Sequence, residues 1–101
     1  LTGSGPAYFF YLMESMQAAG IRLGLNPQIC RQLVEQTALG AATMVVESDA
    51  SPDELRRQVT SKGGTTEAAL DKLHDKDFSS VVGSAIDAAY RRSIELSKTP
   101  D

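Results

Sequence analysis

The chain has 101 residues, a net charge of −3 and a single cysteine, Cys30. This length predicts one small domain, and the lone cysteine excludes an internal disulfide and fits a reducing, cytoplasmic location. Lys and Arg are spread along the chain, so no basic patch supports nucleic-acid binding, and no uncharged apolar run is long enough to span a membrane. Strand-type alternation is nearly absent, which predicts an all-α fold. Because the chain opens at Leu1 and not at Met, we expect it to be a piece of a longer protein.

The first predicted helix covers about residues 6–23. Ser4 or Gly5 is placed to cap it, and Pro6 suits its first position because an amide hydrogen there would have no helical partner. Its first half, residues 7–13, is apolar nearly all round. One small domain cannot easily cover such a helix, so we expect another domain or a second copy of the chain to pack on it.

The second and third helices have clear start signals. Asn26-Pro27 predicts a capped start for a helix that runs to about Glu47, and Ser51-Pro52-Asp53-Glu54 predicts a capping box for a short helix to about Gln58. The apolar face predicted for the second helix contains Cys30, Leu33, Val34, Thr37, Ala38, Ala41, Met44 and Val45.

The last two predicted helices follow a glycine-containing stretch. The fourth ends around residues 74–76, and the fifth runs from Phe78 to about Lys98, with Asp77 as its cap. We expect the tail after Lys98 to fray. The stripe predicted for the fifth helix contains Phe78, Val81, Val82, Ala85, Ile86, Ala89 and Ser93.

Residues 59–66 are the stretch with the most unusual composition, since small hydroxyl residues, Gly63, Gly64 and a helix start coincide there. The free amides at a helix start suit an anion, and glycine lets a ligand approach the main chain. An ordinary helix–loop–helix turn would use the same residues, so chemistry alone leaves both interpretations open. The stretch is neither a Walker loop nor a Gly-x-Gly-x-x-Gly fingerprint.

Few other residues indicate chemistry. His74 is expected at the surface near a helix end, and Cys30 is expected to be a buried packing residue. Glu14 interrupts the most apolar helix and is either a polar-face residue or the partner of a group across an interface. One His and one Cys cannot form a metal site, so no metal is predicted.

Two motifs at helix starts, Gly3-Ser4-Gly5-Pro6-Ala7-Tyr8 and Thr60-Ser61-Lys62-Gly63-Gly64-Thr65-Thr66, together resemble the C-terminal domain of the pyrroline-5-carboxylate reductase family. Further segments extend the resemblance over essentially the whole chain: Ala18-Ala19-Gly20, Gly24-Leu25, Leu39-Gly40-Ala41-Ala42, Ser51-Pro52-Asp53-Glu54-Leu55-Arg56, and Phe78 at the start of the last helix.

The resemblance implies a five-helix domain of the 6-phosphogluconate-dehydrogenase-like type, which spans residues 1–101 and supplies dimerisation and substrate binding. It implies an interlocked homodimer, often in a higher oligomer, and an N-terminal Rossmann domain that binds NADPH or NADH. The implied reaction is reduction of 1-pyrroline-5-carboxylate to L-proline, and this chain alone is expected to be inactive. A non-catalytic, all-α dimerisation or anion-binding module of another enzyme is the alternative, and an upstream Gly-x-Gly-x-x-Gly/Ala sequence would favour the reductase.

The resemblance also implies site residues. The substrate carboxylate is expected at Ser61, Gly63, Gly64, Thr65 and Thr66, mainly on backbone amides, with the Thr66 hydroxyl near the ring nitrogen as the catalytic group. Gly5 and Pro6 are expected to approach the nicotinamide. Lys62 departs from the proline usual in the family, which leaves the free loop less rigid and adds a positive charge.

Overall fold

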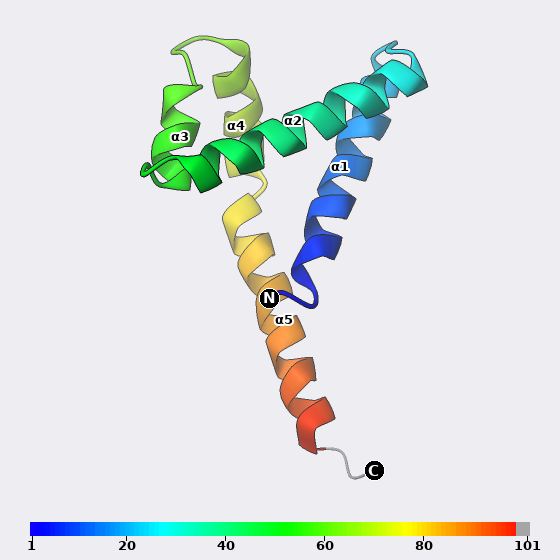
Figure 1. The fold of residues 1–101 in the computed structure, drawn as a ribbon, viewed down its shortest axis with the longest axis vertical. Coiled ribbons are helices and arrows are strands. Elements are labelled where there is room, and N and C mark those ends of the chain that lie inside the picture. The colour runs from blue at the N-terminus through cyan, green and yellow to red at the C-terminus, as the bar shows by residue number, and fades with distance from the viewer. Residues whose placement is uncertain (99–101) are drawn as a thin grey trace. The chain divides into compact units, whose positions relative to one another are not determined.

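The computed structural model describes residues 1–98, which form five α-helices and no strand (Figure 1). The chain divides into two compact units, one ending at Leu55 and the other beginning at Arg56, and each is described by itself. The bounds are α1 Gly5–Arg22, α2 Pro27–Glu47, α3 Pro52–Gln58, α4 Thr65–Asp75 and α5 Phe78–Lys98. The all-α prediction and the five predicted helices are confirmed, while the tail expected to fray lies outside the described residues.

Helix α1 begins and ends as its sequence predicts, with one difference. Ser4 occupies the N-cap, but its side chain makes no capping hydrogen bond. At the other end, the Gly24 amide donates to the Ile21 carbonyl and the Leu25 amide donates to the Gly20 carbonyl, both at 3.0 Å. Gly24 has φ +104°, so these two bonds form a Schellman motif, which requires the left-handed conformation that glycine adopts without strain.

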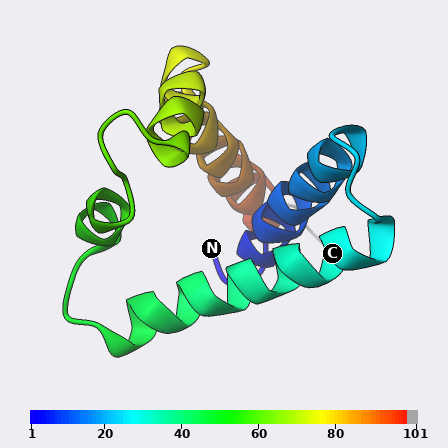
Figure 2. The same cartoon turned by 90° about the horizontal axis from the view of Figure 1, so that it is seen from above.

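From this motif the chain turns back, and α2 packs against α1 (Figure 2). The Asn26 side chain caps α2 as predicted, because its Oδ1 accepts hydrogen bonds from the amides of Gln28 at 2.9 Å and Ile29 at 3.3 Å. Cys30 is only 2% exposed, and its Sγ donates to the Gln17 carbonyl at 3.4 Å. This confirms the prediction that Cys30 is a packing residue.

Gly20 is the residue that permits this close approach. A Cβ built on Gly20 would lie 2.5 Å from Cys30 Sγ and 3.3 Å from Leu25 Cδ1. The close crossing of α1 and α2 is therefore a packing reason for glycine at position 20.

Very little of the chain is buried by its own residues. Among residues 1–98, only Cys30 and Val34 are buried apolar residues. Other members of the predicted α2 face stay exposed, including Leu33 at 52% and Met44 at 47%. In the first half of α1, the three aromatic residues Phe9, Phe10 and Tyr11 are 67–72% exposed. The periodic faces are therefore present, but this chain does not cover them.

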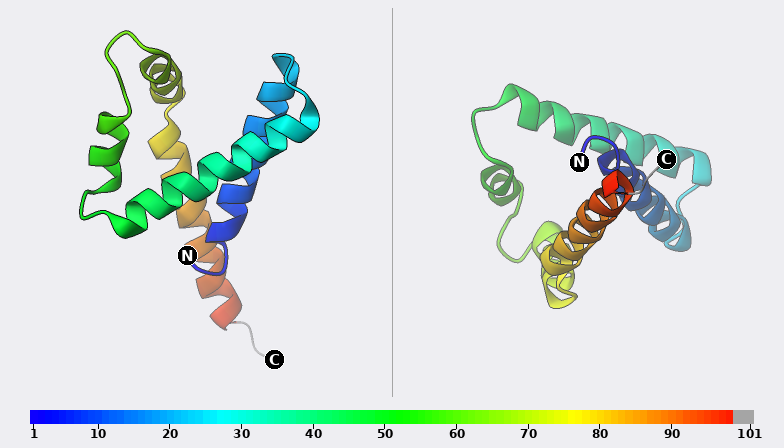
Figure 3. Two further views of the ribbon diagram at one scale, coloured as in Figure 1. Left: turned by 45° about the horizontal axis from the view of Figure 1, so that its top comes forward. Right: turned by 90° about the horizontal axis from the view of Figure 1, so that it is seen from below.

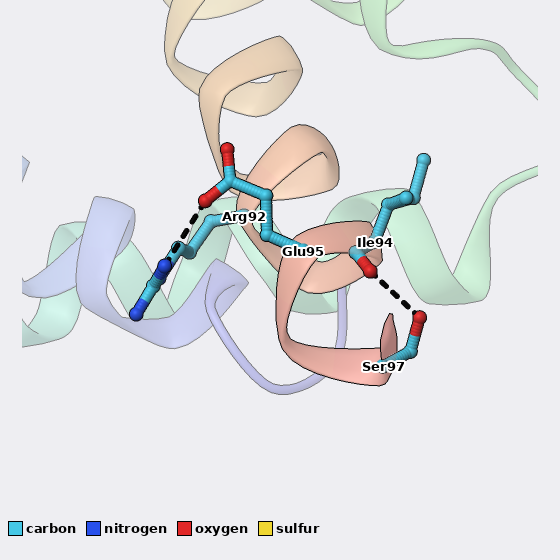
Figure 4. A network of polar contacts seen from close by, with 4 residues as sticks. All are labelled: Arg92, Ile94, Glu95 and Ser97. Carbon is cyan, nitrogen blue, oxygen red and sulfur yellow. Dashed lines mark hydrogen bonds and ion pairs between the residues drawn. The ribbon is translucent and has the colours of Figure 1, made fainter. Parts of the chain in front are cut away.

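In the second unit, a tight turn joins α4 to α5. Asp77 lies in this turn with φ +57°, its amide donates to the His74 carbonyl, and its own carbonyl accepts from the Val81 amide, both at 3.0 Å. The apolar stripe predicted on α5 is again exposed, with Val81 at 61%. Near the end of α5, Arg92 pairs with Glu95 at 3.0 Å, and the Ser97 hydroxyl donates to the Ile94 carbonyl at 2.8 Å (Figure 4).

Replacing Gly20 by Ala should destabilise the first unit, because the new methyl group would overlap Cys30 Sγ. Overpacking of this kind typically costs about 1–3 kcal/mol in the free energy of unfolding. Thermal and urea unfolding at one protein concentration would measure the loss. The double variant G20A/C30A removes the overlapping sulfur and should recover part of it. Equal stability of Gly20→Ala and the wild type would contradict the close crossing.

Candidate functional site

The residues expected to bind an anion lie in the connection between α3 and α4, here called the glycine loop (residues 59–64), and in the first turn of α4 (Figure 3). The loop leaves α3 at Thr60, whose amide donates to the Arg57 carbonyl at 3.2 Å and whose hydroxyl donates to the Arg56 carbonyl. The Thr60 hydroxyl is therefore committed to the end of α3.

A β-turn over Ser61, Lys62, Gly63 and Gly64 follows. The Gly64 amide donates to the Ser61 carbonyl at 3.0 Å, which closes the turn. Gly63, the third residue of the turn, has φ +75°, whereas Lys62 is not among the residues with positive φ. A φ that is positive at the third residue and not at the second distinguishes a type II turn from types I, I′ and II′, and it explains why glycine occupies position 63.

The turn leads directly into α4. Gly64 is its N-cap, with φ −89° and ψ −177°, and no side chain caps the helix. In the described part of the chain, the amides of Thr65 and Thr66 and the hydroxyls of Ser61, Thr65 and Thr66 have no hydrogen-bond partner. Of the predicted residues, Thr65 and Thr66 thus offer free amides at the positive end of a helix, with hydroxyl groups beside them, as an anion requires.

The other two amides of the predicted set are already occupied. The Gly64 amide binds the Ser61 carbonyl, and the Gly63 amide donates to Glu67 Oε1 at 3.0 Å. Sequence reasoning named Gly63 and Gly64 but missed Glu67, although a Glu in the third helical position is the spacing of a capping box. In this structure Gly63 and Gly64 shape the turn, while Thr65 and Thr66 carry the free amides.

Gly64 was expected to let a ligand approach the main chain. A Cβ on Gly64 would instead meet the Ser61 carbonyl oxygen at 3.1 Å, inside the loop itself. Gly64→Ala would therefore disturb the turn whether or not a ligand binds there.

The remaining candidate residues lie elsewhere. Gly5 and Pro6 are the first two residues of α1, in the other unit, and their approach to a nicotinamide stays a prediction. His74 is exposed in the last turn of α4, as expected. Glu14 lines a shallow hollow between α1 and α2 with Arg31, whose guanidinium pairs with Glu35 at 2.7 Å. Both predicted alternatives for Glu14, a polar-face residue or the partner of a group across an interface, stay predictions.

Residues 1–98 offer neither a metal site nor a helix that could span a membrane. No group of three or more His, Cys, Asp or Glu side chains there could hold a metal ion. Of the helices in the same residues, none combines the length and the apolar character needed to cross a membrane.

The turn geometry makes a prediction about Gly63 and Gly64. Gly63→Ala should cost about 1 kcal/mol in stability because φ +75° is left-handed, and Gly64→Ala should be destabilising through its contact with the Ser61 carbonyl. Gly3→Ala is the control, since its Cβ meets nothing within 4 Å and its φ is not positive. Urea unfolding of the three variants checks this, and a Gly63→Ala protein as stable as the control would be evidence against the type II turn.

Comparison with known proteins identifies relatives along the whole chain. A pyrroline-5-carboxylate reductase from Pseudomonas aeruginosa is 50% identical over 98 residues, which are 97% of this chain and 36% of that protein. The solved structure of a pyrroline-5-carboxylate reductase from Coxiella burnetii matches with a TM-score of 0.93 and 47% identity, over 98% of this chain and 37% of that one. The Plasmodium falciparum pyrroline carboxylate reductase, solved with NADP bound, matches with a TM-score of 0.87 and 36% identity, over 90% of this chain and 35% of that one.

The chain therefore spans a little over a third of the length of its relatives. A family profile described as pyrroline-5-carboxylate reductase dimerisation matches residues 1–96. The helical fold, the order of the motifs and this match agree, and the chain belongs to the pyrroline-5-carboxylate reductase dimerisation family.

Proposed function

We propose that this chain is the C-terminal part of a pyrroline-5-carboxylate reductase, which reduces 1-pyrroline-5-carboxylate to L-proline with NADPH or NADH. The observation that carries the proposal is family membership over residues 1–96, combined with the free amides of Thr65 and Thr66 at the start of α4. A cytoplasmic location belongs to the same proposal and is supported by the single free cysteine.

The substrate is small and carries a carboxylate beside a ring imine. We assign its carboxylate to the amides of Thr65 and Thr66, with the Ser61 hydroxyl as a further donor. Hydrogen bonds from neutral donors to an ionised carboxylate are stronger than those between neutral groups, and the α4 dipole adds to them. Gly63 and Gly64 form the turn that holds these donors in place.

Binding the carboxylate leaves the imine to be reduced. When bound, the nicotinamide supplies the hydride that goes to the imine carbon, and the ring nitrogen takes a proton. Thr66 has a half-buried side chain whose hydroxyl has no partner among the described residues, so it is available to orient the ring nitrogen or relay that proton. Residues 59–66 contain no Asp, Glu or His, so the loop contributes mainly by positioning the substrate.

The dimer is the second part of the proposal. Each large aromatic side chain presents about 150–250 Å² of surface, so Phe9, Phe10 and Tyr11 at 67–72% exposure amount to roughly 300–500 Å². That area from three residues alone is as large as the biggest apolar patch of a typical monomer, about 300–600 Å². A second copy of the chain, packed on α1, accounts for it. The Gly5 and Pro6 contact with the nicotinamide belongs to the full-length enzyme.

In the full-length reductase, Thr66→Ala should lower kcat about ten- to a hundredfold, because one hydrogen bond to a developing charge contributes about 1.5–3 kcal/mol. The backbone amides stay, so KM should change less. Thr66→Ser keeps the hydroxyl and should retain most activity, and Thr65→Ala controls for loss of a neighbouring hydroxyl. An unchanged kcat with a raised KM would move Thr66 from the chemical step to ground-state binding.

The chain by itself should be a stable dimer without reductase activity. Sedimentation equilibrium measures its mass and would also show any higher oligomer. A well-folded monomer at high micromolar concentration would refute the dimer proposal. A full-length protein that dimerises but does not reduce 1-pyrroline-5-carboxylate would favour the non-catalytic module.

A further inference from the structure

We propose that Glu67 is a positioning residue that holds the glycine loop closed before the substrate binds, and that it supplies the constraint that Lys62 does not. This inference rests on the proposed function, since it concerns the same carboxylate site. The carrying observation is the 3.0 Å hydrogen bond from the Gly63 amide to Glu67 Oε1.

The bond reaches across the start of the helix. Glu67 is the third residue of α4, and its carboxylate passes the N-cap Gly64 to accept from the residue before it. A capping box would place this contact on the N-cap amide itself. Here the Gly64 amide is engaged by the Ser61 carbonyl, so each of the two glycine amides has its own acceptor. The turn is therefore held from two sides, by its own backbone and by α4.

The turn needs this second bond. Gly63 is the residue type with the greatest conformational freedom, and at φ +75° its conformation must be selected from many. Position 62 is the second residue of a type II turn, where proline would fix φ in advance. Lys62 does not fix its φ angle in this way, so the free loop has more conformational entropy to lose on closing than a loop with proline at position 62. The charged acceptor Glu67, half-buried at the positive end of α4, offsets that loss.

Closure through Glu67 also leaves the substrate donors free. Its carboxylate binds the Gly63 amide and not those of Thr65 or Thr66, so a substrate carboxylate does not have to displace it. Its negative charge nevertheless repels a second carboxylate nearby. Glu67 thus has two effects of opposite sign on KM: closing the loop lowers KM, and charge repulsion raises it. Glu67→Ala removes both effects, whereas Glu67→Gln removes the charge and keeps an oxygen acceptor.

The first test measures loop closure in the full-length protein without substrate. The measured quantity is the rate of amide hydrogen exchange, followed by NMR. The Gly64 amide should exchange faster in Glu67→Ala and at nearly the wild-type rate in Glu67→Gln. Adding Lys62→Pro to Glu67→Ala should restore protection, because proline constrains the same turn. Asp71→Ala, which removes an exposed acidic residue of the same helix, is the control for charge alone. Unchanged Gly64 exchange in Glu67→Ala would overturn the proposal.

The second test measures KM and kcat for 1-pyrroline-5-carboxylate. Losing one hydrogen bond that preorganises the site should raise KM about three- to tenfold in Glu67→Ala, with kcat nearly unchanged. KM should stay at or below the wild-type value in Glu67→Gln and return toward it in the double variant K62P/E67A. A lowered KM in Glu67→Ala, or no rescue by Lys62→Pro, would overturn the positioning role. A wild-type protein that does not reduce this substrate would defeat the proposed function instead, and the exchange measurement would still decide whether Glu67 closes the loop.

Discussion

The main constraint on this chain is that it cannot bury its own apolar side chains. Cys30 and Val34 are the buried apolar residues of the described part, whereas the aromatic residues of α1 are mostly exposed. Hydrophobic burial is the dominant favourable contribution to folding, and short helices are marginal in water without it. Helix α3, with seven residues, is well below the roughly 12–15 residues at which an isolated helix becomes marginally stable. The exposed apolar faces are what a member of a dimerisation family is expected to have, because a partner surface would bury them.

Hydrogen bonds at the helix ends stabilise helices that have only a small core to pack on. These capping signals made the helix bounds predictable. Asn26 caps α2 with two hydrogen bonds, and Gly24 forms the Schellman motif after α1. Both signals act within a few residues of chain, so sequence alone carries them. The surface that covers a helix, in contrast, is not encoded in the few residues around it. The period of the α2 face predicted Val34 and Leu33 alike, yet Val34 is 7% exposed and Leu33 is 52% exposed. Periodicity identifies an apolar face but not the surface that packs on it.

The candidate site shows the same division between local and spatial information. The composition of residues 59–66 identified the loop, and the helix start after it was predicted correctly. Two adjacent glycines cannot be told apart by sequence, however. Gly63 has φ +75° and needs to be glycine for its backbone, while Gly64 is extended and needs it because a Cβ would meet the Ser61 carbonyl. The Glu67 contact was not predicted because its carboxylate accepts from Gly63, one residue before the position that a capping box predicts.

Some amides of the loop are bonded within it and others are left free, and this division bears on how a helix start can bind an anion. If the amides of residues 63–66 were all free, the loop would have to order itself as a ligand binds, and that entropy would be subtracted from the affinity. With the Gly63 and Gly64 amides engaged internally, the turn is already formed in this structure, and the Thr65 and Thr66 amides are left without a partner. Under the proposed function such preorganisation matters, because the loop contains no general acid and accurate placement of the imine would be its main contribution to the rate. For the proposed reaction, fewer donors held in a fixed geometry would serve better than more donors on a loop that has to order itself.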